Sequence, residues 1–177
     1  MRAICIAVLL LSGACAAASS AQTPASSPQA AAEAPCQRPE FAALDFWIGE
    51  WDVSWEGGQG VNRISKTFDG CVIEEHFEGG PSTNNLVGAS FSTFQAPLGQ
   101  WRQTWVDNQG GYFALVGGPV GDDFILTNTR LREDAPHLRM VFENITHDSL
   151  TWRWQRSSDG AAWSDAWVIQ YRRRAAH

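Results

Sequence analysis

The residues of this sequence that could bind or act on a small molecule are a few polar side chains that alternate with apolar ones. In the segment 71–78, Glu75 would share one face of a strand with Ile73 and Phe77, so its carboxylate would lie in an apolar setting. A register shifted by one residue would bury three ionisable groups in place of one. We therefore expect Glu75 to point inward, where it could bind a ligand or serve as a general acid or base.

Two further segments combine tryptophan with a polar side chain. Gln103 has Trp101 and Trp105 two positions away on either side, and Arg156 follows Trp154 at the same spacing. Residues two apart lie on the same face of a strand, and apolar walls with a few polar groups are typical of ligand pockets. The predicted ligand-binding residues are Trp51, Glu75, Gln103, Trp105, Trp154 and Arg156.

The same polar residues have a purely structural interpretation. Arg156 could neutralise Glu75 across the interior, and together with Gln103 they would form a network that only stabilises the fold. Small barrels are often filled by their own side chains. The sequence leaves both interpretations open.

Other candidate sites are weak. Glu74, His76 and Glu78 alternate on the opposite face of segment 71–78, at a spacing that could ligate a metal. No further histidine is placed to complete the set, so we expect a solvated face, no metal and no cofactor. The sequence contains no nucleophile elbow, phosphate-binding loop or Cys–His dyad.

Strands must position these residues. Short alternating segments separated by turn residues, such as Asp69-Gly70 and 117–119, continue to near residue 171. They give about ten strands, a number and spacing typical of a sandwich or an up-and-down barrel. Closure is favoured because it removes exposed edges. Residues 39–44 begin with proline and have helical apolar spacing, which predicts a short N-terminal helix.

The first strand is predicted over residues 47–55. Trp47, Trp51 and Trp55 alternate there with polar residues, and Gly49 lies on their face. Three large rings on one face require a thick core or a cavity to receive them.

The N-terminal part of the sequence predicts export. A positive charge at Arg2, an apolar stretch and small residues up to Ala21 predict a signal peptide over 1–21, cleaved before Gln22. Lipid attachment at Cys15 is the less favoured alternative. Residues 22–35 are rich in Ala, Ser, Pro and Gln and predict a flexible linker, followed by a barrel domain over 36–175. We expect a periplasmic or secreted protein.

Cysteine use and charge agree with this compartment. Cys36 and Cys71 follow the predicted cleavage site, and an oxidising compartment favours a disulfide between them over two buried thiols. The chain has a net charge of −6 and its basic run is confined to residues 172–174. We therefore expect no nucleic-acid partner, and nothing in the sequence resembles an integral membrane span.

A family resemblance adds to this interpretation. The segment 46–53 (FWIGEWDV), the segment 101–107 (WRQTWVD) and the Ser-x-Asp-Gly-x-x-Trp turn at 157–163 resemble an uncharacterised bacterial family of exported calycin-like barrels. The Gly-x-Trp at residue 49 is also similar to that of lipocalins and nitrobindins. The resemblance implies a ten-strand barrel with a short N-terminal helix and no established activity. Nitrobindins hold haem through a late histidine, which the segment 167–171 lacks.

The sequence thus predicts an all-β protein, an antiparallel up-and-down calycin-like barrel. The leading functional hypothesis is binding of a small, mostly apolar molecule in the barrel interior. The alternatives are an enzyme that uses Glu75 as general acid or base, and a structural or interaction module with a solid core. Binding is favoured over catalysis.

Overall fold

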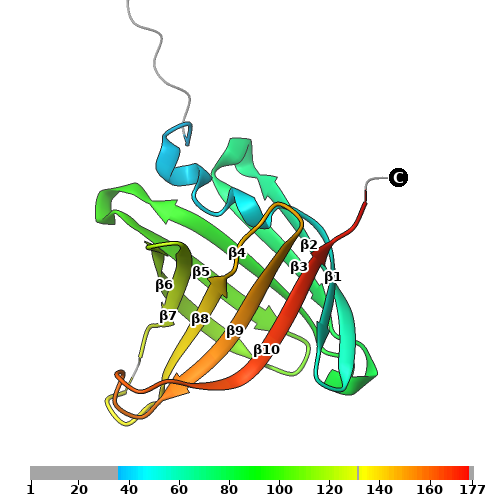
Figure 1. Ribbon diagram of the computed structural model, residues 1–177. Helices are drawn as coiled ribbons and strands as arrows, with labels where there is room; N and C mark the ends of the chain where they lie inside the picture. Colours follow the sequence, from blue (N-terminus) through cyan, green and yellow to red (C-terminus); the bar gives the residue numbers. More distant parts are fainter. Residues whose placement is uncertain (1–35, 131, 176–177) are drawn as a thin grey trace, which may run out of the picture. The chain divides into compact units, whose positions relative to one another are not determined.

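The computed structural model describes residues 36–130 and 132–175. The predicted signal peptide (1–21) and linker (22–35) lie outside the described residues. Ten antiparallel strands form one closed barrel (Figure 1), and its strands follow one another around the wall in sequence order, with β1 paired to β10. This confirms the all-β, closed up-and-down architecture. The strands are β1 (Gly49–Trp55), β2 (Gly58–Thr67), β3 (Val72–Glu78), β4 (Val87–Gln95), β5 (Gln100–Asp107), β6 (Tyr112–Val120), β7 (Asp123–Asn128), β8 (His137–Glu143), β9 (Ser149–Ser157) and β10 (Ser164–Arg173).

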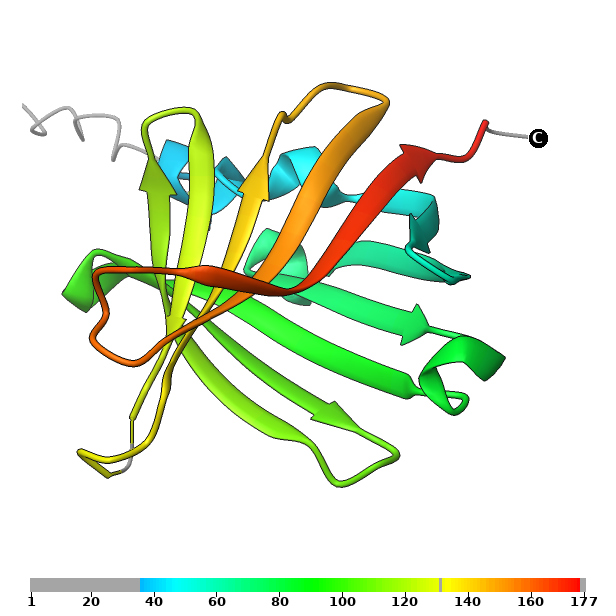
Figure 2. The same ribbon diagram turned by 60° about the horizontal axis from the view of Figure 1, so that its bottom comes forward.

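The two ends of the barrel differ. At the end where β1 begins, the closed end, the short 3-10 helices η1 (Pro39–Ala42) and η2 (Asp45–Trp47) precede the first strand, and the side chains of Phe41 and Leu44 are buried. At the opposite end, the pocket end, the turns at 79–86 and 158–163 lie on the rim; Figure 2 brings this end forward. Three more 3-10 turns connect strands: η3 (Phe68–Gly70), η4 (Pro81–Thr83) and η5 (Ala96–Leu98).

Trp47 does not belong to the first strand, contrary to the sequence prediction. Its backbone N–H donates to the carbonyl of Leu44 at 3.1 Å, so it ends η2 and β1 begins at Gly49. Its ring is fully buried and packs edge-on against Phe142, with ring centroids 5.0 Å apart. A turn of 3-10 helix thus carries Trp47 into the core at the closed end, and period-two alternation cannot distinguish this from a strand.

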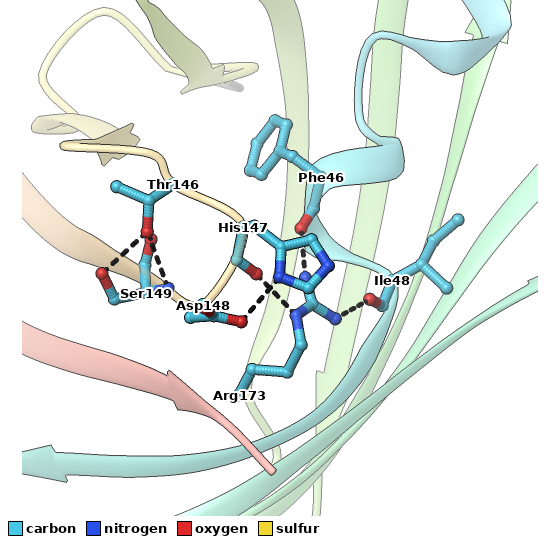
Figure 3. Close-up of polar contacts among 7 residues, drawn as sticks. All are labelled: Phe46, Ile48, Thr146, His147, Asp148, Ser149 and Arg173. Atoms are coloured by element: carbon cyan, nitrogen blue, oxygen red, sulfur yellow. Dashed lines mark hydrogen bonds and ion pairs between the residues drawn. The ribbon is translucent and has the colours of Figure 1, made fainter. Parts of the chain in front are cut away.

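Arg173, at the end of β10, joins three segments at the closed end (Figure 3). Its guanidinium donates to the carbonyl oxygens of His147 at 2.6 Å, Phe46 at 3.0 Å and Ile48. The same group lies 4.0 Å from the centroid of the Trp51 ring, a cation–π arrangement. These contacts connect the last strand, the β8–β9 turn and the entry to β1.

Strand β6 runs through the glycines at which the sequence predicted a turn. It continues to Val120, and Gly117 and Gly118 pair with residues of β7. A side chain at Gly117 would collide with the backbone carbonyl of Ile125. The glycine therefore permits a close approach between two strands, and such an approach is a common reason for glycine inside a strand.

The predicted disulfide is confirmed, because Cys36 and Cys71 are bonded to each other. It ties the segment before η1 to the turn before β3. Within residues 36–130 and 132–175, no helix is both long and apolar enough to cross a membrane.

Candidate ligand-binding cavity

Glu75 lies inside the barrel, as the register argument predicted, and its side chain is only 4 % exposed. Both of its carboxylate oxygens are bound by side chains of neighbouring strands. Asn62 of β2 donates from Nδ2 to Oε1 at 2.7 Å, and Ser90 of β4 donates from Oγ to Oε2 at 2.5 Å. Strands β2 and β4 flank β3, so the pleat of three consecutive strands brings these groups together.

The environment of Glu75 shifts its proton affinity. Burial raises the pKa of this carboxyl from 4.5 to about 7, although the hydrogen bonds from Ser90 and Asn62 and the positive potential of His76 act in the opposite direction. Two donors are thus too few to restore the solvation that water would supply. Glu75 is therefore poised to gain or lose a proton near neutral pH.

Tyr171 extends this network to the last strand. Asn62 also donates from Nδ2 to the Tyr171 hydroxyl at 2.9 Å, so one amide bridges the phenol and the carboxyl. Burial and the negative charge of Glu75 both raise the pKa of Tyr171, which keeps the phenol neutral. The four strands β2, β3, β4 and β10 thus meet in one polar cluster, formed by Asn62, Glu75, Ser90 and Tyr171, in the barrel interior.

A cavity of about 140 Å³ lies between this polar cluster and the pocket end. Its side walls are aromatic: Trp152 and Trp154 lie parallel with ring centroids 6.2 Å apart, and Trp167 packs edge-on against Trp152 at 5.9 Å. Several wall residues are half-buried, so the cavity lies close to solvent. The cavity is lined by Glu75, Phe77, Leu86, Trp105, Asp107, Phe113, Leu115, Met140, Trp152, Trp154, Trp167, Ile169 and Tyr171.

Asp107 contributes a second carboxylate at the end of β5. Its Oδ2 accepts a hydrogen bond from Nε1 of Trp105 at 2.9 Å, and its Oδ1 accepts from the backbone N–H groups of Gln109 at 2.9 Å and Gly111 at 2.8 Å. Desolvation opposes ionisation here, but these donors outweigh it and lower the pKa of Asp107. The group is therefore ionised at neutral pH.

The structure brings together only part of the predicted site. Glu75, Trp105 and Trp154 line the cavity. Trp51 and Gln103 are buried, but they lie outside its lining. Gln103 donates from Nε2 to Ser92 Oγ at 3.0 Å, and its Oε1 has no hydrogen-bond partner in the described part of the chain.

The suggested pairing of Arg156 with Glu75 is wrong. Arg156 is exposed at the end of β9, away from the cavity lining, and within residues 36–130 and 132–175 it forms no ion pair. The side chains that bind the carboxyl are instead Asn62 and Ser90. The alternation that placed Arg156 on the inner face of β9 does not show how far the strand extends beyond the core.

Sequence reasoning missed several residues of the site. Trp152 could have been found, since it precedes Trp154 by two positions on the same strand. Asn62, Ser90 and Tyr171 carried no signal of their own, because they meet Glu75 only through strand pairing. Asp107 shares a face with Trp105, and that alternation was a usable signal for it.

The outer face of β3 contains the three residues considered as metal ligands. There His76 contacts Glu74 at 2.9 Å, and Glu78 pairs with Arg63 at 2.6 Å. Within the described ranges 36–130 and 132–175, no group of three histidine, cysteine or acidic residues is arranged to hold a metal ion.

No protein-family model and no curated protein sequence matches this chain significantly.

Proposed function

We propose that this protein binds a small, mostly apolar molecule inside a calycin-like barrel that is exported from the cytoplasm. The observation that carries the proposal is the cavity of about 140 Å³, walled by aromatic rings beside the buried carboxyl of Glu75. The closed up-and-down topology and the Gly49-x-Trp51 start of β1 support the calycin-like assignment.

The size of the cavity limits the ligand. An apolar cavity of about 150 Å³ accepts benzene, so a molecule with one aromatic ring and a short substituent is the expected size. For about ten non-hydrogen atoms at roughly −0.5 kcal/mol each, binding would contribute about −5 kcal/mol, which is a Kd of order 0.1 mM. Titrations therefore need ligand concentrations up to several millimolar.

The proposal is tested by titrating one-ring compounds into the purified protein and following tryptophan emission. Ligand entry should change the emission, because Trp105, Trp152 and Trp154 line the cavity. Met140→Trp, which fills the cavity from β8, should weaken binding at least tenfold. Phe91→Trp is the matched control, since Phe91 is exposed on β4. Equal binding by both variants, or no response to any compound, would contradict the proposal.

Export is the second part of the proposal. The Cys36–Cys71 disulfide is compatible with an oxidising location. The mature protein should begin at Gln22, which the intact mass of the exported protein measures. A lipid-modified N-terminal Cys15 would show a lipoprotein instead. Mass spectrometry of small molecules that copurify with this exported form would identify a natural ligand.

A second candidate function is catalysis by Glu75. It is favoured by the pKa of about 7, which suits a general acid or base at neutral pH. Turnover that disappears in Glu75→Gln while the fold persists would support it. Failure of the protein to bind any component of a lipid extract would instead favour a structural or interaction module.

A further inference from the structure

We propose that the ligand is a small organic cation, an arylalkylamine with one aromatic ring, whose ammonium group is bound by Glu75. The inference rests on the ligand binding proposed above and specifies its chemistry.

The walls of the cavity suit a cation. Aromatic rings attract a cation that approaches their faces, and indole attracts it most strongly among the side chains. Four of the lining residues are tryptophans, and they come from three strands, β5, β9 and β10. Phe77, Phe113 and Tyr171 add further rings. An apolar aromatic ligand ring would also pack well in such a site, so both parts of an arylalkylamine are accommodated.

The charges of the cavity have one sign. Its ionisable lining groups are Glu75, Asp107 and Tyr171, and the thirteen described residues of the lining include no lysine, arginine or histidine. Asp107 is ionised, as shown by its lowered pKa. The whole chain also carries a net charge of −6. The cavity therefore attracts cations and repels anions.

Glu75 retains the capacity to bind an ammonium group. A carboxylate has about four acceptor sites, and the structure fills one on each oxygen, with Asn62 and Ser90 as donors. An ammonium group would supply further donors. It would also place a positive charge beside the buried carboxylate, which no described residue of the cavity lining does. A hydroxyl group could fill one acceptor site but would leave the charge uncompensated.

Binding should therefore be linked to the protonation of Glu75. Burial raises the pKa of Glu75 to about 7, and a bound ammonium group favours its ionised form, so binding releases a proton. The groups that face Glu75 are Tyr171 from β10, Asn62 from β2 and Ser90 from β4, with His76 adjacent on the outer face of β3 and Asp107 towards the rim. Amine affinity should fall about tenfold from pH 8 to pH 6, where Glu75 is mostly protonated.

The test compares three ligands of similar size: 2-phenylethylamine, 2-phenylethanol and 3-phenylpropionate. Each is titrated into the full mature protein at pH 6, 7 and 8, with tryptophan emission and calorimetry as readouts. At pH 8 the amine should bind at least tenfold more tightly than the alcohol, and the carboxylate should bind most weakly. The alcohol should show no comparable change in affinity with pH.

Variants on the two faces of β3 locate the effect. Glu75→Gln should remove the preference for the amine and its pH dependence while leaving affinity for the alcohol within about threefold. Glu78→Gln removes one exposed carboxylate from the outer face of the same strand and should change neither. If Glu75→Gln fails to fold, calorimetry of the wild type in buffers of different ionisation enthalpy gives an independent measurement. It should show release of about half a proton per amine bound at pH 7.

Three outcomes would overturn the inference, and they are distinguishable from one another. If the alcohol binds as tightly as the amine at every pH, the cation preference is wrong while the proposed binding function stands. If none of the three ligands binds, the inference and the binding proposal both fail. Proton release near zero on amine binding would also exclude Glu75 as the ammonium-binding group.

Discussion

Replacing Glu75 by glutamine should change how the stability of the barrel depends on pH. The folded protein binds a proton at Glu75 more tightly than the unfolded chain does, because burial raises the pKa from 4.5 to about 7. The carboxyl's contribution to stability is therefore fully present below pH 4.5 and is lost as the pH rises through 7. With about 1.4 kcal/mol for each pKa unit, the loss is about 3 kcal/mol.

The measurement is urea-induced unfolding of the unreduced protein, followed by tryptophan emission between pH 4.5 and 8.5. Other groups titrate as well, so the informative quantity is the unfolding free energy of the wild type minus that of Glu75→Gln. This difference should fall by about 3 kcal/mol between pH 4.5 and 8 and remain constant at higher pH. Glu78→Gln is the control, because exposed ion pairs contribute at most about 1 kcal/mol.

One result would refute this reasoning. If the difference between wild type and Glu75→Gln stays constant within about 0.5 kcal/mol from pH 4.5 to 8, the carboxyl is not desolvated enough to retain its proton. The pH dependence expected for amine binding would then lose its basis as well. A difference that increases with pH would mean that donors around Glu75 stabilise its ionised form, and the sign of the argument would be wrong.

Three further predictions concern the frame around the cavity. Replacing Cys36 and Cys71 by serine should lower the unfolding free energy by about 3–4 kcal/mol, because the disulfide joins residues 35 positions apart. Alkylation of the denatured, unreduced wild type should label neither of these cysteines. Arg173→Met should lower the unfolding free energy by about 2 kcal/mol, measured by urea unfolding, because it removes charged donors from three carbonyls. Arg172→Met, the same change at an exposed arginine, should have little effect. Gly117→Ala should cost about 1–3 kcal/mol by collision with the facing strand. Gly118→Ala is the control in the same urea assay: both glycines have a positive φ that strains alanine, but a methyl group at Gly118 meets only an ordinary contact, so this change should cost less.

The architecture could be predicted from the sequence because it follows from local patterns. Period-two alternation, turn residues at regular intervals and the scarcity of helical segments indicated about ten antiparallel strands. Closure followed from the need to cover edges in a regular meander, and β1 does pair with β10. The inward position of Glu75 was also predictable, because the opposite register would have buried more ionisable groups.

Local patterns failed where tertiary contacts changed the role of a residue. Trp47 continues the alternation of β1 in the sequence, yet it ends a 3-10 helix that covers the closed end. Gly117 lies in a segment (117–119) whose composition is typical of a turn, but it allows a close approach between β6 and β7. Arg156 alternates with the inward-facing tryptophans of β9, but its side chain is exposed near the end of that strand. In each case the outcome depends on how the strands and the closed end pack in three dimensions, and period-two alternation does not contain that information.

The sequence by itself therefore indicated about ten antiparallel strands and the side of β3 that is buried, and it favoured the pairing of Cys36 with Cys71. The tertiary structure decided the environment of Glu75, because its two donors and Tyr171 come from three other strands. It also decided that the tryptophans of β5, β9 and β10 surround a cavity on one side of this carboxyl. Alternation fixes the face on which a side chain lies, but closure of the barrel fixes which faces meet, and the size of the space between them depends on that closure.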